Sequence, residues 1–328
     1  MRGMTLARRM LAVALVAASP ALLLAAPASG RSVVVGIGDQ NGHFFDDARF
    51  HALHIKHARL LVPWDAHKYE WQVERVDRWL TAARRAGVVP LIVFDKSVTQ
   101  QYKTMLPSAE DFAETIAAFR ARYPWVREFA TWNEPNICVQ PTCEHPERVA
   151  AYYDVLRARC ADCRVLAASI LGVSGMRPWV KRFLAAAHST PRYWGLHNYI
   201  DVNGYNRSTT RKLLQLVKGQ VWITETAGLV SWRVDRDLPF RTSATHARFA
   251  LDWLFDWLLP AERRVTRVYL YQWDYAPGSP WDSALIDSRG KSRPAFAVLR
   301  HAIRHGIRHT RRGEKQARQR WIRRHLGR

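Results

Sequence analysis

Short apolar runs recur along the chain and predict eight β-strands. Most are nearly continuous in aliphatic and aromatic residues and do not alternate with polar ones. Strands that are buried on both faces have this pattern, which is typical of parallel sheets. The runs are Val33–Gly38, Ala58–Val62, Val88–Phe94, Val126–Trp132, Arg164–Ser169, Tyr193–Tyr199, Val221–Thr226 and Arg267–Trp273.

The segments between these runs have helical spacing of apolar residues. Trp71–Ala86 is amphipathic and is followed by Gly87, a typical C-terminal signal. Ser108–Tyr123 begins with Ser-x-x-Asp, which is close to a capping box. The other predicted helices are Asp46–Leu53, Pro146–Arg159, Pro178–His188, Ser208–Lys218, Ser243–Leu259 and Pro294–Ile303.

This alternation of strands and helices predicts an α/β fold, a single (β/α)8 TIM barrel. We expect the barrel domain to span residues 29–303. The chain has 328 residues, of which 48% are hydrophobic, enough for one large core. A doubly wound open sheet is the alternative, but no glycine-rich phosphate loop follows any predicted strand.

Residues 1–28 have the organisation of a secretory signal peptide. Arg2, Arg8 and Arg9 precede the apolar run Leu11–Ala26, and Ala26-Pro27-Ala28 forms a small-x-small cleavage site. A membrane anchor is the alternative, but the run is short and is interrupted by a proline. The pattern predicts a secreted or cell-envelope-associated protein.

Four cysteines form two close pairs, Cys138/Cys143 and Cys160/Cys163. Disulfides suit an exported protein, and four cysteines allow three connectivities. The predicted strands place the two pairs at opposite ends of the barrel, which favours two local bridges. A zinc site is the alternative, but two well-separated Cys-x-x-Cys pairs are lacking, so no metal is expected.

The net charge is +22, and its distribution is uneven. Residues 301–328 hold ten Lys/Arg and one Glu, so residues 304–328 are expected to form a basic tail that does not join the core. Such charge raises the possibility of nucleic-acid binding, but no known nucleic-acid motif is present. The tail is either a solubilising segment or a tether to anionic cell-wall polymer or lipid headgroups.

Two glutamates, Glu134 and Glu225, follow the fourth and seventh predicted strands. The C-terminal ends of barrel strands carry the active site in TIM-barrel enzymes. Two carboxyl groups brought together are the minimum requirement for cleaving a glycosidic bond. Asp39, Asp65 and Asp95 also follow strands, where they could bind sugar hydroxyls or cap the next helix.

The residues around these glutamates resemble the clan A glycoside hydrolases. The resemblance rests on Asn133-Glu134-Pro135, Thr224-Glu225, His197-Asn198-Tyr199, Arg59 and Trp273, and it spans roughly residues 33–300. Families 128, 39 and 5 look most similar. The resemblance implies a retaining enzyme in which Glu134 is the general acid/base and Glu225 the nucleophile, with no cofactor.

The same chemistry suggests roles for the neighbouring residues. Asn133 would bind the sugar 2-hydroxyl, Arg59 would keep Glu225 ionised, and Tyr199 would orient it. His197 would bind a hydroxyl or tune one glutamate. Four tryptophans at strand ends, Trp64, Trp132, Trp273 and Trp281, are candidates for stacking on sugar rings.

We therefore predict a monomeric enzyme that cleaves a β-linked glycan. A catalytically silent carbohydrate-binding barrel is the main alternative. Loss of function usually removes a carboxylate, and both are present here.

Overall fold

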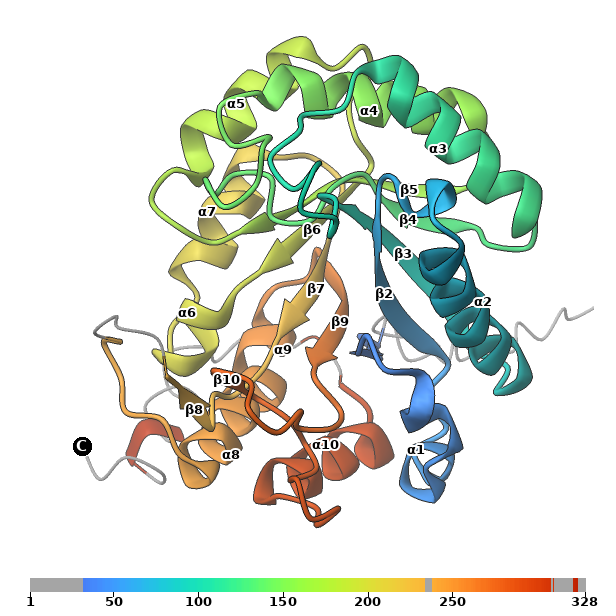
Figure 1. Ribbon diagram of the computed structural model, residues 1–328. Coiled ribbons are helices and arrows are strands. Elements are labelled where there is room, and N and C mark those ends of the chain that lie inside the picture. Colours follow the sequence, from blue (N-terminus) through green and yellow to red (C-terminus); the bar gives the residue numbers. More distant parts are fainter. Residues whose placement is uncertain (1–31, 234–237, 308, 310–320, 324–328) are drawn as a thin grey trace, which may run out of the picture. The chain divides into compact units, whose positions relative to one another are not determined.

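The computed structural model describes residues 32–233, 238–307, 309 and 321–323. Eight parallel strands close into a barrel in the order β1-β2-β3-β4-β5-β6-β7-β9 (Figure 1). The strands are β1 (Val34–Gly38), β2 (His57–Pro63), β3 (Val89–Asp95), β4 (Glu128–Ala130), β5 (Arg164–Leu171), β6 (Tyr193–His197), β7 (Gln220–Thr226) and β9 (Val265–Tyr271). The predicted (β/α)8 barrel and its eight strands are confirmed.

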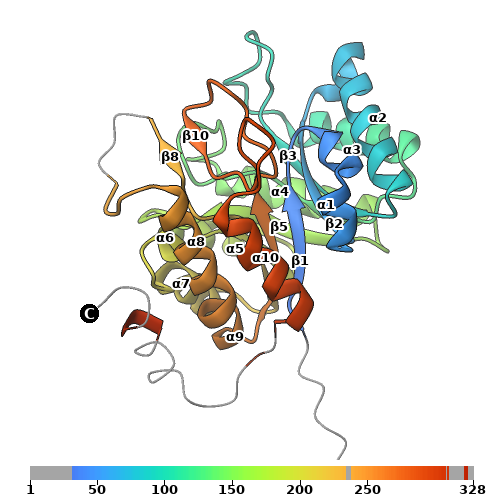
Figure 2. The ribbon, with the colours of Figure 1, turned by 90° about the horizontal axis from the view of Figure 1, so that it is seen from below.

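Helices surround the barrel, and α8 and α10 lie side by side on its outside (Figure 2). They are α1 (Ala48–Ala52), α2 (Glu70–Arg85), α3 (Ala109–Arg122), α4 (Pro146–Arg159), α5 (Met176–Ala186), α6 (Tyr199–Asn203), α7 (Ser208–Leu216), α8 (Ala244–Trp253), α9 (Leu259–Ala261) and α10 (Pro294–His305). The capping box predicted at Ser108 is formed with Asp111. No helix within the described ranges is long and apolar enough to cross a membrane.

Several elements depart from the sequence prediction; β4, for example, is four residues shorter than predicted. Tyr199 does not extend β6 but begins α6, so the predicted strand is two residues too long. The predicted helix 243–259 is interrupted by a π-helix at Leu254–Leu258. An additional two-stranded antiparallel sheet pairs β8 (Ser231–Trp232) with β10 (Trp281–Asp282).

The interior of the barrel is filled and has no channel. Leu91, Val93, Ala130, Leu166, Trp222 and Tyr269 form an inner core. Towards the N-terminal ends of the strands, Glu128 pairs with both Arg164 and Arg267, and the Arg267 guanidinium lies 3.8 Å from the centre of the Trp222 ring. Apolar packing and this buried ionic cluster together close the lower end of the barrel.

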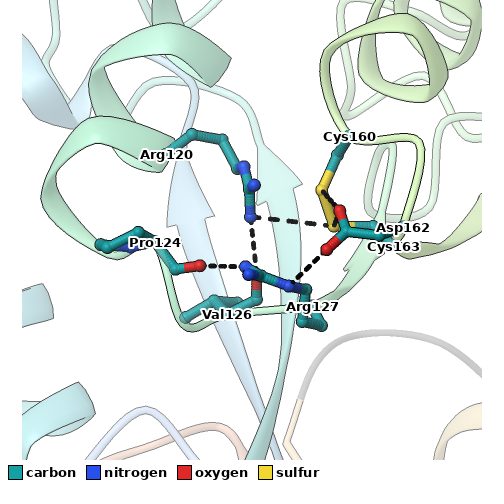
Figure 3. Close-up of a disulfide and its surroundings, with 7 residues drawn as sticks. All are labelled: Arg120, Pro124, Val126, Arg127, Cys160, Asp162 and Cys163. Carbon is teal, nitrogen blue, oxygen red and sulfur yellow. Dashed lines mark hydrogen bonds and ion pairs between the residues drawn. A yellow bond between two sulfur atoms is a disulfide. The ribbon is translucent and has the colours of Figure 1, made fainter.

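Both disulfides are local, as predicted: Cys138–Cys143 follows β4, and Cys160–Cys163 precedes β5. Figure 3 shows the Cys160–Cys163 disulfide. Asp162, between the two cysteines, forms a 2.8 Å ion pair with Arg127, and Arg120 approaches the Cys163 sulfur. This bridge lies at the lower end of the barrel, opposite the strand ends that carry Glu134 and Glu225.

The basic C-terminal segment is only partly separate from the barrel. Ile307 is buried, and its carbonyl accepts a 3.0 Å hydrogen bond from the Val33 amide. Trp321 is buried against the rings of Tyr205 and Trp253. The expectation that residues beyond 303 stay off the core is therefore wrong for these two. Residues 310–320 and 324–328 lie outside the described part of the chain.

Candidate active site

The chain turns sharply after β4, at Asn133 and Glu134. The Asn133 amide donates to the carbonyl of Phe94 and the Glu134 amide to that of Ser169, both at 2.8 Å, so β3 and β5 fix this segment from either side. Glu134 has a φ of 43°, a left-handed conformation that is uncommon for residues other than glycine. Such conformations cluster at functional sites, where the surrounding structure enforces them.

Arg59 of β2 joins the two glutamate-bearing segments. It is completely buried, and it donates to Glu225 at 2.5 Å and to the Asn133 side-chain oxygen at 2.7 Å. One guanidinium therefore sets the relative positions of the residues that follow β4 and those at the end of β7. The predicted proximity of Arg59 to Glu225 is present.

His197 contacts the other glutamate. Its Nδ1 lies 2.8 Å from Glu134, and its Nε2 lies 3.4 Å from Nη2 of Arg59. Because a guanidinium can only donate, Nε2 is the acceptor and Nδ1 carries the proton. His197 therefore donates a hydrogen bond to Oε1 of the Glu134 carboxyl group.

Tyr199 holds Glu225 from the side opposite Arg59, and its hydroxyl donates to Glu225 at 2.9 Å. Burial and the neighbouring Glu225 charge raise the pKa of Tyr199 well above 10, so the hydroxyl stays protonated. The first turn of α6, not a longer strand, gives Tyr199 this position.

The charge state of Glu225 follows from its neighbours. Burial alone would raise the pKa of this carboxyl, but the Arg59 guanidinium, His197 and the Tyr199 hydroxyl hold it below its ordinary value of 4.5. Glu225 is therefore an anion at neutral pH, with both carboxylate oxygens in hydrogen bonds.

The two glutamates are close in space. One side-chain atom each of Glu134, His197 and Glu225 lie within 4.8 Å of one another. Three such groups have the spacing of a metal site, but Arg59 bonds directly to Glu225. A fixed positive charge there opposes a cation, so the set suits carboxylate chemistry better than metal binding.

Three of the four candidate tryptophans do not face this site. Trp273 is fully buried, donates from its indole nitrogen to Asp47 and packs on Phe50. Trp64 and Trp132 are also buried. Trp64 and Trp273 both belong to the hydrophobic core, and their role in substrate binding stays a prediction.

Trp281 is the candidate that does approach the site. It lies edge-on to Tyr199, with ring centres 4.8 Å apart, and it contacts Trp232 at 4.5 Å. Both tryptophans are partly exposed. Trp232 was missed because its two-residue strand is too short to give a pattern in the sequence.

The loop after Glu134 is firmly braced. The Asn136 amide pairs with the backbone of Leu171, and the Cys138–Cys143 bridge closes the loop. Gln140 accepts from the Trp132 indole and donates to Asp95 at 2.8 Å. Burial raises the pKa of Asp95 to about 6, and the nearby Glu134 adds to this rise. Asp95 thus fastens the loop to the end of β3.

A family described as glycosyl hydrolase catalytic core matches residues 68–298, most of the chain. The chain belongs to this family. The match includes β3 to β9 and both glutamates, and it agrees with the clan A resemblance. A comparison with curated protein sequences gave no match.

Solved structures of glycoside hydrolases share the barrel fold at low identity. A glucosidase from Croceicoccus marinus is 11% identical with a TM-score of 0.62, covering 85% of this chain and 69% of that one. Xylanase 10B from Thermotoga maritima is 10% identical with a TM-score of 0.59, covering 84% and 95%. A family 39 glycoside hydrolase from Bacteroides cellulosilyticus is 14% identical with a TM-score of 0.58; the alignment covers 83% of this chain and only 64% of that enzyme.

Proposed function

We propose that this glycosyl hydrolase is a retaining enzyme that cleaves β-linked glycans by double displacement. The observation that carries the proposal is the approach of Glu134 and Glu225 to within 4.8 Å. Retaining enzymes hold their carboxyl groups about 5–5.5 Å apart, and inverting enzymes leave about 6.5–9.5 Å for a water molecule. The close approach of one oxygen from each carboxyl group supports the retaining arrangement.

The neighbours of the two carboxyl groups support unequal roles. Glu225, kept anionic by Arg59, attacks the anomeric carbon and forms a glycosyl ester. Glu134 gives its proton to the departing oxygen. It then takes a proton from the water that attacks the ester, which restores both carboxyl groups. In this proposal Asn133 binds a hydroxyl of the reacting sugar, and Trp281 with Trp232 contacts its apolar face.

A β-linked glucan, xylan or galactan is the proposed substrate class. The enzymes of similar fold include a xylanase, a β-glucosidase and two β-1,4-galactanases. An α-L-arabinofuranosidase of Thermotoga maritima has a similar fold as well, so the assay panel also includes an aryl α-L-arabinofuranoside.

The decisive experiment compares wild-type protein with Glu134→Gln and Glu225→Gln on aryl β-glycosides and β-glucan, xylan and galactan. We expect both variants to lose nearly all activity. Azide should restore turnover to Glu225→Ala and give a glycosyl azide of inverted configuration. If both glutamine variants keep the activity of the wild-type protein, the assignment of the catalytic residues is refuted. A folded wild-type protein that binds these glycans but cleaves none would favour the silent barrel.

We further propose that the protein is exported, is a monomer, and uses the charges of residues 310–320 to contact an anionic envelope surface. The signal-peptide prediction, residues 1–28, lies outside the described residues. Truncating the C-terminal segment would also remove Trp321, which packs on the barrel. The test therefore changes only the charges of the segment. Replacing the Lys/Arg of 310–320 with Gln should release the protein from envelope fractions at low salt, and unchanged retention would contradict the tether.

A further inference from the structure

A small cavity lies beside the catalytic pair, between the tip of β2 and the first turns of α2. Its volume is about 150 Å³, and its lining includes Trp71, Gln72 and Arg75 of α2, Leu61 of β2, Asp95 and Val98. Pockets that hold drug-sized ligands measure about 300–1,000 Å³. This cavity is smaller and suits one ring of a larger ligand.

The cavity adjoins the active site through two strands. β2 supplies Arg59 to the glutamates and Leu61 to the cavity. At the end of β3, Asp95 lines the cavity and also lies close enough to Glu134 for their charges to interact.

Two large hydrophobic residues at the edge of the cavity are exposed, although folding normally buries such side chains. Trp71 is 52% exposed and Val98 is 54% exposed, although both are large hydrophobic residues. Neighbouring polar groups, Arg75, Asp95 and Gln40, surround them. An aromatic face beside hydrogen-bonding groups matches a sugar ring, which has apolar C–H faces and hydroxyls around its edge.

Gln72 provides an independent indication of a ligand. Its side chain is 2% exposed, and neither amide atom has a hydrogen-bond partner within the described part of the chain. An unpaired buried amide costs free energy, so such groups are uncommon without a partner outside the protein. Gln72 lines this cavity and can pair with hydroxyl groups placed there.

We propose that this cavity is a subsite for a further sugar ring of the substrate. The inferred natural substrate is therefore an oligo- or polysaccharide that extends beyond the sugar at the two glutamates. The inference rests on the proposed glycosidase function and deepens it. Trp71 stacks on the ring, and Gln72, Arg75 and Asp95 bind its hydroxyls.

The test uses the full chain carrying Glu225→Gln, which binds without cleaving. Retardation in gels containing laminarin, barley β-glucan, xylan or galactan measures affinity. Adding Trp71→Ala should weaken retention by about three- to ten-fold, the size of one aromatic stacking contact. Trp71→Phe should restore most of the retention. Val89→Ser, at an exposed residue at the opposite end of β3, is the matched control and should bind normally.

Gln72→Leu separates a binding role from a structural one. If Gln72 awaits a ligand, the variant binds glycan more weakly while its Tm is unchanged or higher, because the unpaired amide is gone. A lower Tm with unchanged binding would give Gln72 a structural role and overturn its part in the subsite.

The subsite and the catalytic proposal fail in different ways. In the otherwise wild-type enzyme, Trp71→Ala should leave turnover of aryl monoglycosides unchanged and raise KM for longer oligosaccharides. Equal retention of the Trp71→Ala protein, or no retention by any of the four glycans, overturns the subsite. Monoglycoside cleavage that survives Glu134→Gln and Glu225→Gln instead overturns the catalytic assignment.

Discussion

Arg59 is the residue on which the active site depends most. It is buried, and its two terminal nitrogens serve Glu225, Asn133 and His197 at once. Two chemically identical glutamates consequently meet different surroundings. Glu225 has the Arg59 guanidinium bonded directly to it, whereas Glu134 is bonded to the His197 ring. The unequal roles of the two carboxyl groups follow from this difference.

Removing the Arg59 charge should shift the pH dependence of catalysis. Arg59 lowers the pKa of Glu225, and burial opposes it. In Arg59→Met the pKa of Glu225 rises, so the acid limb of the kcat/KM profile should move to higher pH. Arg78→Met, at an exposed ion pair, is the control and should keep the wild-type profile.

The same shift has a consequence for stability. A depressed carboxyl pKa stabilises the fold above the unfolded-state pKa, and this contribution is lost as pH falls through the folded-state value. Urea unfolding should therefore show the wild-type protein losing Glu225-linked stability only below pH 4.5, the ordinary value for this group. Arg59→Met should lack this contribution at every pH, and an identical pH dependence of the two proteins would contradict it.

Tyr199 donates one hydrogen bond to the charged Glu225, and Tyr199→Phe removes only that bond. Hydrogen bonds to charged groups are worth about 1.5–3 kcal/mol, so kcat/KM should fall about ten- to a hundredfold. Tyr205→Phe removes a comparable bond to His246 away from the site and should leave kcat/KM unchanged. Equal effects of the two changes would remove Tyr199 from the active site.

The sequence identified the polar residues of the site better than its aromatic ones. Glu134, Glu225 and Arg59 belong to strands whose C-terminal ends must converge, so strand order alone brings them together. Trp64 and Trp273 also follow strands, but a shift of one residue turns a side chain from the mouth of the barrel to its outer layer. The residue pattern does not determine that direction.

At the scale of elements, the loop after β4 carries much of the organisation of the site. It leaves Glu134 in a left-handed conformation and is tied to β3 and β5 by Asp95, Gln140 and Asn136. The barrel supplies the position of Glu134, and this loop restrains its direction.

The two disulfides should therefore differ in their effect on activity. Cys138→Ser/Cys143→Ser loosens the loop beside Glu134, and we expect kcat/KM to fall about tenfold or more, since small displacements of catalytic groups are costly. Cys160→Ser/Cys163→Ser alters a loop at the other end of the barrel and is the matched control. Circular dichroism should show both variants folded, and equal kcat/KM for the two would contradict a role for the first loop.

The predictability of the elements depended on their length. The eight barrel strands gave clear apolar runs because both of their faces are buried. The β8–β10 sheet, with two residues in each strand, is created by contacts between distant loops and has no local pattern. The π-helix inside 254–258 was equally invisible, since its residues continue the helical spacing of α8.

At the scale of the whole molecule, the C-terminal segment contributes to the fold as well as to the charge. Trp321 covers Tyr205 and Trp253. Trp321→Ala should lower the free energy of unfolding by about 3 kcal/mol, the usual cost of removing a buried tryptophan. Urea denaturation measures this, with kcat of the folded protein as the control. An unchanged urea midpoint would show that Trp321 is not packed in solution.

The packed lower end of the barrel restricts how substrate, products and water reach the two glutamates. Glu128, Arg267 and the inner core fill the lower end of the barrel, so substrate, departing alcohol and attacking water share the upper entrance. In the proposed double displacement, the first product leaves the face over Glu134 before water reaches the ester. Added alcohols would compete with water there, so a retaining enzyme should also form new glycosides when acceptor alcohols are abundant.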